Sequence, residues 1–448
     1  MSEDINLDQK LEYKGYWYLP SAPELKIAGF VTYYPNEKIT LELIGAFDEE
    51  IETLFSDKNE PVIYGETSDA KDISLIQCYQ YSSLNFAAGF PIVRYTCNYM
   101  IIGKYIMSLE EKSYYCASFN IPELSFWCHP AAINYTVYSD EKEQETKKLC
   151  LSFISTDFQS KNDIICSVDI NEDTSIFLKR RISYNETTYR LKAHLEQYTY
   201  VEIVRKKKSS ILDFLSNIHI YEDFISLATL STVKSSEITL FDNELYEQVG
   251  EKKFYKSINI IHPYSDREDF LGGKKQDYLF DYLAIKDIYP DILKAWFNAP
   301  SDLYPIRLHL IDSLKQKKVF GSVDFLILIQ AVEGFWWRFR DKNYRLTNTI
   351  SKKVTTSLNT IMTELVNEFK DVELLTKASI DIDAVVDSRH YYSHFLPKSK
   401  KPKTLEGITL FKESKKLRVL LICCILSFMG LNNSQINDIF KKSNSEFL

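Results

Sequence analysis

Residues 325–339 read FLILIQAVEGFWWRF, and this stretch decides the fold of the C-terminal part of the 448-residue chain. Leu326, Ile329, Val332 and Trp336 recur at spacings of three and four residues, which predicts an amphipathic helix. Similar periodicity begins at about Ile285 and continues to the C-terminus. Further helices are expected at 288–296, 354–369, 380–395, 414–429 and 434–442. Residues 285–448 are therefore predicted to form an all-α helical bundle of ordinary domain size.

The region before this bundle is dominated by short β-rich runs. Residues 27–34 and 39–45 flank the turn residues at 35–37, and similar runs follow at 95–106, 114–119, 149–154, 164–170 and 198–204. No βαβ alternation is visible, which argues against Rossmann and α/β-hydrolase folds. We expect an α+β multidomain protein with a β-rich, antiparallel, sandwich-like N-terminal domain.

The expected boundaries follow from these patterns. Residues 1–262 form the β-rich domain, interrupted near 209–232 by two helical stretches, 209–218 and 224–230. Strands return at 237–241 and 254–261. Residues 263–284, which contain Gly272-Gly273 and Lys274-Lys275, are predicted to be a linker, and the helical domain occupies 285–448.

Composition limits the class of protein. The 45% hydrophobic and 14% aromatic fractions exclude a largely disordered chain. A formal net charge of -8 provides no overall positive field, so any nucleic acid must be bound by a local group of basic residues. The polar N-terminus lacks a signal-peptide core, and the longest apolar run, 419–431, is too short to span a bilayer. We expect a cytoplasmic protein without a membrane partner.

The hexapeptide Arg389-His390-Tyr391-Tyr392-Ser393-His394 carries most of the chemical information. Histidine exchanges protons near neutral pH, and arginine offers a permanent cationic fork to a phosphate. A metal-free ribonuclease that cleaves RNA through its own 2′-hydroxyl needs a proton acceptor, a proton donor and a cation. Arg389, His390 and His394 could supply all three.

Helix geometry complicates this interpretation. His390 and His394 lie one turn apart on the same face, whereas Arg389 and His394, five residues apart, point away from each other on an ideal helix. Either the helix ends near His394, or two copies of the motif meet across a dimer. Pro397 favours a helix end at or before Leu396. A structural role is the alternative, with Asp387 as the ion-pair partner of Arg389.

Neighbouring residues could support RNA binding. A basic segment follows the hexapeptide and could grip backbone phosphates, or simply be a solvated loop; its lysines are Lys398, Lys400, Lys401 and Lys403. Tyr391 and Tyr392 could stack on bases or pack in the core. Glu333, in an apolar helix, needs a partner: it could orient Arg389 or a histidine, or pair with Arg338 or Arg340.

No cofactor or metal is predicted. The sequence lacks a HExxH motif, a His/Cys cluster, a Gly-rich phosphate loop with its Lys-Ser/Thr continuation, and a serine-hydrolase elbow.

The segment around Arg389-His390-x-x-x-His394 resembles the HEPN superfamily, whose signature is an arginine, a polar residue and a histidine after a short spacer. Residues 325–333 look like the family's helix with an alanine-x-glutamate step, and 420–431 are similar to its closing helix. The β-rich domain with its Trp17-x-x-Pro20 opening, the connecting helical stretch and the HEPN unit together resemble the ApeA-like branch.

This resemblance implies a metal-independent endoribonuclease of bacterial antiphage abortive infection, which cleaves host or phage RNA when infection triggers it. HEPN sites typically form at a dimer interface, which implies a homodimer or higher homo-oligomer. Arg389 would bind the phosphate, His394 would act as general acid or base, and His390 would orient the phosphate. The N-terminal domain would be the sensor or restraint, with a phage protein as trigger.

The alternative is a non-catalytic binding or sensor protein whose HEPN unit only dimerises or binds nucleotides. The intact, adjacent arginine and histidine favour cleavage over this alternative.

Overall fold

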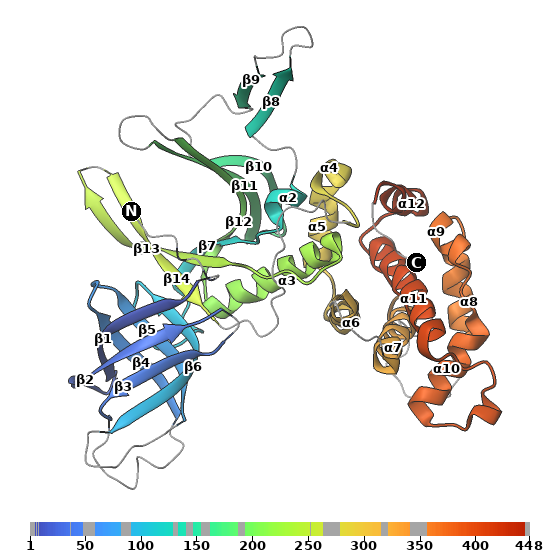
Figure 1. Ribbon diagram of the computed structural model, residues 1–448, viewed down its shortest axis with the longest axis horizontal. Helices are drawn as coiled ribbons and strands as arrows, with labels where there is room; N and C mark the ends of the chain where they lie inside the picture. The colour runs from blue at the N-terminus through green and yellow to red at the C-terminus, as the bar shows by residue number, and fades with distance from the viewer. Residues whose placement is uncertain are drawn as a thin grey trace. The chain divides into compact units, whose positions relative to one another are not determined.

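The computed structural model describes residues 5, 7, 9–35, 37–47, 59–81, 91–128, 133–139, 147–153, 162–186, 193–250, 252–262, 278–314, 321–340 and 356–443. The chain divides into two compact units (Figure 1). The first comprises Met1–Phe126, Pro130–Ile220 and Lys234–Phe270. The second comprises Trp127–His129, Tyr221–Val233 and Leu271–Leu448.

Six antiparallel strands of the first unit close into a barrel. The strands are β1 (Leu11–Leu19), β2 (Ala22–Tyr33), β3 (Ile39–Ile44), β4 (Asn59–Thr67), β5 (Asp72–Gln80) and β6 (Ile92–Ile102). They pair in the ring β1-β2-β3-β6-β5-β4, and β4 returns to β1. Trp17 fills the interior with Val31, Leu41 and Leu75. Residue 65 is glycine because any side chain there would overlap the Trp17 ring.

A second antiparallel sheet continues from the barrel. The last residues of β6 pair with β14, and the order then runs β14-β13-β7-β12-β11-β10. These strands are β7 (Tyr114–Asn120), β10 (Asn162–Asp169), β11 (Thr174–Glu186), β12 (Ala193–Ser209), β13 (Glu237–Val249) and β14 (Lys252–Ile261). A separate two-stranded sheet is formed by β8 (Ile133–Ser139) and β9 (Lys147–Phe153).

The expected fold class is confirmed: strands build the N-terminal region, helices the C-terminal one. The predicted sandwich-like arrangement is a closed barrel that continues into a sheet. The barrel closes because β6 pairs with β3 on one side and with β5 on the other. The two helical stretches expected near 209–232 are one helix, α3 (Ile211–Thr229). Residues 263–277 of the predicted linker lie outside the described residues, and α4 (Tyr282–Ile285) forms near its end. The domain limits at 262 and 285 stay a prediction.

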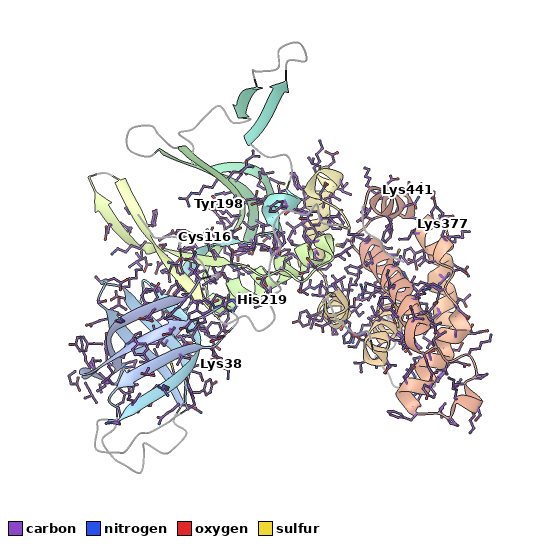
Figure 2. All side chains as sticks on the ribbon, in the orientation of Figure 1. Lys38, Cys116, Tyr198, His219, Lys377 and Lys441 are labelled. Carbon is purple, nitrogen blue, oxygen red and sulfur yellow. The ribbon has the colours of Figure 1, made fainter. Side chains whose placement is uncertain are left out.

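Helices build the second unit. They are α4, α5 (Tyr289–Phe297), α6 (Tyr304–Leu314), α7 (Ser322–Phe339), α8 (Leu358–Glu368), α9 (Glu373–Ala378), α10 (Ile382–His394), α11 (Gly407–Phe428) and α12 (Asn433–Lys442), with short 3-10 turns at Ser301–Leu303 and Lys398–Lys400. The middle of α11 is buried on all sides, so it is the central helix. Glu373 on α9 pairs with Lys377 and with Lys441 of α12. Figure 2 labels these two lysines. None of the described helices combines the length and apolarity needed to cross a bilayer.

An aromatic cluster at the start of this unit recruits residues from earlier in the chain. The short helix α2 (Leu124–Trp127) ends in Trp127, whose ring packs on Phe224 of α3 and on Tyr282 and Tyr289. Its indole Nε1 donates to the Phe280 carbonyl at 2.8 Å. The helical unit therefore includes chain segments that precede residue 234.

Candidate active site

Helix α10 positions the hexapeptide. The Asp381 side chain caps its first turn by accepting a hydrogen bond from the Ala384 amide at 3.0 Å. The helix ends at His394 because Phe395 adopts a left-handed backbone, φ 52°, just before Pro397. The predicted end at or before Leu396 is confirmed. The Phe395 side chain is 89% exposed, in a conformation that normally selects glycine.

Arg389 and His394 meet within one copy of the chain. The Arg389 Nη1 and His394 Nε2 atoms are 2.8 Å apart. The structure shows the first of the two alternatives: the helix ends at His394, and the long Arg389 side chain reaches this last turn. Arginine can only donate hydrogen bonds, so Nε2 is the acceptor and the proton of neutral His394 lies on Nδ1.

Glu333 of α7 is the second partner of Arg389. Its Oε2 lies 3.4 Å from Arg389 Nη2, and the two side chains are 24% and 22% exposed. The two other arginines suggested for Glu333 have different partners: Arg340 pairs with Glu368, and Arg338 donates to the Asp302 carbonyl.

Asp387, the sequence-based alternative partner of Arg389, instead pairs with Lys401 at 3.2 Å. Its other oxygen accepts the Lys403 amide, also at 3.2 Å. Asp387 lies two residues before Arg389, so the two side chains leave different sides of the helix. The ion pair between Asp387 and Arg389 that the sequence suggested is therefore wrong.

His390 stacks on His394, with ring centroids 5.7 Å apart and planes inclined by 27°. Partial burial lowers the pKa of His390, and the nearby Lys401 ammonium, Arg389 and His394 lower it further. A lowered pKa favours the neutral imidazole at neutral pH. The site thus combines a permanently charged arginine with a histidine held uncharged.

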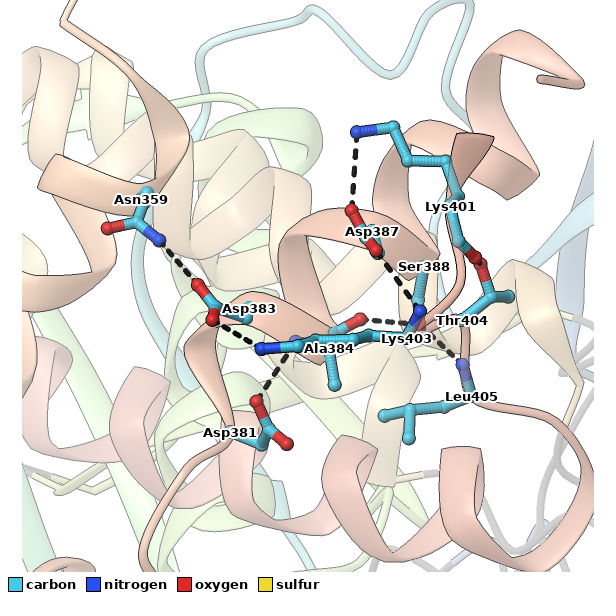
Figure 3. Close-up of polar contacts among 10 residues, drawn as sticks. All are labelled: Asn359, Asp381, Asp383, Ala384, Asp387, Ser388, Lys401, Lys403, Thr404 and Leu405. Atoms are coloured by element: carbon cyan, nitrogen blue, oxygen red, sulfur yellow. Dashed lines mark hydrogen bonds and ion pairs between the residues drawn. The ribbon is translucent and has the colours of Figure 1, made fainter. Parts of the chain in front are cut away.

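The residues 398–406, here called the lysine segment, run along α10. Lys403 pairs with Asp383 at 2.6 Å and Lys401 pairs with Asp387 (Figure 3). Lys398 pairs with Glu406 at 2.6 Å. Lys400 is exposed and has no ion pair among the residues that the structure describes. Most of the positive charge expected of this segment is therefore balanced by carboxylates.

Buried hydrogen bonds fix the lysine segment to the helix. The Ser388 hydroxyl donates to the Ala384 carbonyl at 2.7 Å and accepts the Leu405 amide at 2.9 Å. Sequence reasoning missed Ser388. It also missed the holding role of Asp383 and Asp387, although their four-residue spacing opposite a run of lysines was a usable signal.

The two tyrosines have different surroundings. The Tyr392 hydroxyl donates to the Leu405 carbonyl at 2.9 Å, and its ring packs edge-on against Phe325. Partial burial raises the pKa of Tyr392. Tyr391 is half-buried and packs edge-on against Tyr392. Tyr392 thus packs structurally and holds the lysine segment, which leaves Tyr391 as the candidate for base stacking.

Within the described part of the chain, no three or more His, Cys, Asp or Glu side chains are grouped so that they could hold a metal ion.

Two family models match the chain. ApeA N-terminal domain 1 matches residues 12–296, which is more than half of the chain, and Apea-like HEPN matches residues 326–435. The second match spans α8 to α11 and most of α7, and it includes Glu333, Arg389 and His394. No match was found among curated proteins or among solved structures. The chain therefore belongs to the ApeA-like HEPN proteins.

Proposed function

We propose that this protein is a metal-independent endoribonuclease of a bacterial antiphage abortive-infection system, which cleaves host or phage RNA when infection triggers it. The observation that carries the proposal is the gathering of Arg389, His390 and His394 at the end of α10. Membership of a HEPN family supports a nuclease-type antiphage function. These three side chains provide proton transfer and a phosphate-binding cation without a metal.

The reaction is an attack of the RNA 2′-oxygen on the adjacent phosphorus. A base takes the 2′-hydroxyl proton, the 2′-oxygen–phosphorus bond forms, the phosphorus–5′-oxygen bond breaks, and an acid protonates the leaving 5′-oxygen. His394 is the proton-transfer group, and Arg389 stabilises the charge that develops on the phosphate oxygens. His390, held neutral, orients the phosphate by a hydrogen bond. The products are a 2′,3′-cyclic phosphate and a 5′-hydroxyl.

A second copy of the chain is part of the proposal. The reaction needs a base and an acid at opposite ends of the scissile linkage, and the two stacked histidines of one copy lie on the same side. A homodimer through the helical unit brings a second His394 to the phosphate. Lys398, Lys400, Lys401, Lys403 and Tyr391 lie near enough along the chain to contact the flanking nucleotides.

Regulation is assigned to the N-terminal unit. An enzyme of this kind is toxic to its own cell and must stay inactive until infection. We assign to the barrel and its continuing sheet the binding of a phage protein, which releases the activity.

Sequencing RNA ends from phage-infected cells that express wild-type protein or the variant His394→Ala tests the proposal. The wild type should yield new 5′-hydroxyl ends after infection, and lysates of the infected cells should yield them in the presence of a chelator. His394→Ala should reduce cleavage about a hundredfold or more.

His309→Ala, which removes a half-buried histidine of α6 in the same unit, is the matched control and should cleave as the wild type does. Equal cleavage by wild type and His394→Ala would refute the mechanism. RNA binding without new ends would favour a HEPN unit that binds nucleotides without cutting them.

A further inference from the structure

We propose that Glu333 is a positioning residue that keeps the site closed: it holds Arg389 on Nε2 of His394, and an RNA phosphate opens the site by displacing Glu333. The closed arrangement is defined by two contacts, Arg389 Nη1 to His394 Nε2 at 2.8 Å and Arg389 Nη2 to Glu333 Oε2 at 3.4 Å. The inference rests on the proposed function, because it identifies the occupant of the opened site as an RNA phosphate.

The contact with Arg389 stops His394 from acting as a base. A neutral imidazole has a single acceptor nitrogen, and here that nitrogen accepts a hydrogen bond from the guanidinium. A general base must offer the same lone pair to the 2′-hydroxyl of the substrate. His394 therefore becomes competent only after Arg389 moves away from it.

These two contacts use the terminal nitrogens of Arg389, and a bound phosphate needs the same nitrogens. Arginine grips phosphate best through two parallel N–H groups. Its two terminal nitrogens already donate to His394 and Glu333. An arriving phosphate competes for these N–H groups, so binding of the substrate and release of His394 are one event.

The Glu333–Arg389 pair has the geometry of an exchangeable contact. It is a single contact at 3.4 Å between side chains that remain about a quarter exposed. The same helix carries a contrasting pair near its C-terminal end, where Arg340 makes three contacts of 2.8 to 3.1 Å with Glu368 and one with Ser427. Of these two pairs, the Glu333 pair is the weaker. An RNA phosphodiester carries the same single negative charge as the carboxylate and can replace it because two of its oxygens fit the guanidinium in a bidentate way.

The carboxylate is consequently a competitor of the substrate. Removing its charge while keeping its shape should strengthen RNA binding, whereas a residue that merely supports the fold or prepares Arg389 for phosphate would weaken binding when changed. The sign of the effect separates the two roles.

The test measures binding of a 2′-O-methyl RNA oligonucleotide, which has no 2′-hydroxyl and cannot be cut by this mechanism. Glu333→Gln in the full chain should bind it about fivefold more tightly than wild type, the factor that corresponds to an exposed ion pair of about 1 kcal/mol. Glu373→Gln is the matched control: it removes the same charge from an exposed pair on α9, with Lys377 and Lys441, and should bind as wild type does.

A second measurement observes the closing contact in the wild-type protein. In protein labelled with ¹⁵N-histidine, His394 is assigned with a His394→Gln variant, and its proton should lie on Nδ1. Adding the 2′-O-methyl RNA should shift its Nε2 resonance, because Nε2 loses the Arg389 donor.

Weaker binding by Glu333→Gln, a proton on Nε2 of His394, or an Nε2 resonance unmoved by bound RNA would each overturn the inference. Failure of the proposed function looks different: wild type would leave RNA uncut while the tautomer and the tighter binding of Glu333→Gln persist. The closing contact would then stand in a protein that binds RNA without cleaving it.

Discussion

His390 has three groups beside it that lower its pKa: Lys401, Arg389 and His394. We predict that Lys401→Met raises the pKa of His390, because it removes the largest of these charge effects while leaving the ring partly buried. The folded-state pKa lies below the ordinary value, so protonation occurs at lower pH than for a free histidine; removing a cation moves the titration upward. An NMR titration of the His390 ring measures this. Lys412→Met, at an exposed position in the first part of α11, is the control and should leave the midpoint in place. A midpoint that stays or falls in Lys401→Met would contradict the electrostatic explanation.

At the scale of single residues, the sequence predicted where helix α10 ends but not the contacts of its long side chains. The end of α10 was predictable because Pro397 restricts the residue before it. The Arg389–His394 contact was not, because helix geometry gives the directions of Cα–Cβ bonds but not the reach of a long flexible side chain. The neutralisation of Lys401 depends on how residues 398–406 turn back along α10, which the sequence does not encode as a periodic pattern.

At the scale of secondary-structure elements, Ser388 joins α10 to the lysine segment, because its hydroxyl accepts a hydrogen bond from the Leu405 amide. We predict that Ser388→Ala lowers the free energy of unfolding by about 1 kcal/mol, since the Leu405 amide loses its acceptor. Denaturant unfolding measures the loss, and hydrogen exchange should show faster exchange at the Leu405 amide. Ser393→Ala is the control, because its hydroxyl bonds only back to the Arg389 carbonyl of its own helix among the described contacts. Unchanged exchange at Leu405 would show that the segment is held by its ion pairs instead.

The helices and strands differ in how closely the sequence predicted their limits and their pairing. The helices α7, α10 and α12 appear within a few residues of their expected limits, because apolar periodicity and stop signals are local properties. The start of α11 was placed seven residues late, since the apolar residues Ile408 and Phe411 in its first turns are exposed and do not continue the buried face of the helix. Closure of the barrel was not predicted, because alternating strands look alike in a barrel and a sandwich. Pairing of β3 with β6 joins residues tens of positions apart, so no short window contains it.

At the scale of the whole molecule, the helical unit depends on Trp127. We predict that Trp127→Ala in the full chain lowers the free energy of unfolding of this unit by about 3–5 kcal/mol, because the ring is fully buried against Phe224 and Tyr282. Near-ultraviolet circular dichroism and thermal unfolding measure the effect. Phe126→Ala changes the neighbouring residue, whose side chain is 44% exposed, and should have a much smaller effect. Similar losses for both variants would contradict the assignment of Trp127 to the core of the helical unit.

Trp127 also has a consequence for how the protein is made. Translation delivers Trp127 and residues 221–233 well before α7 and α10, so a nascent chain already carries them when Arg389 and His394 emerge. Internal initiation, or proteolysis after Val233, would produce a C-terminal fragment. This fragment would contain Arg389 and His394 but lack the aromatic packing at the start of the helical unit. Such by-products are therefore poorly equipped to fold. The arrangement links the proposed ribonuclease activity to chains whose synthesis has already passed through Trp127 and residues 221–233.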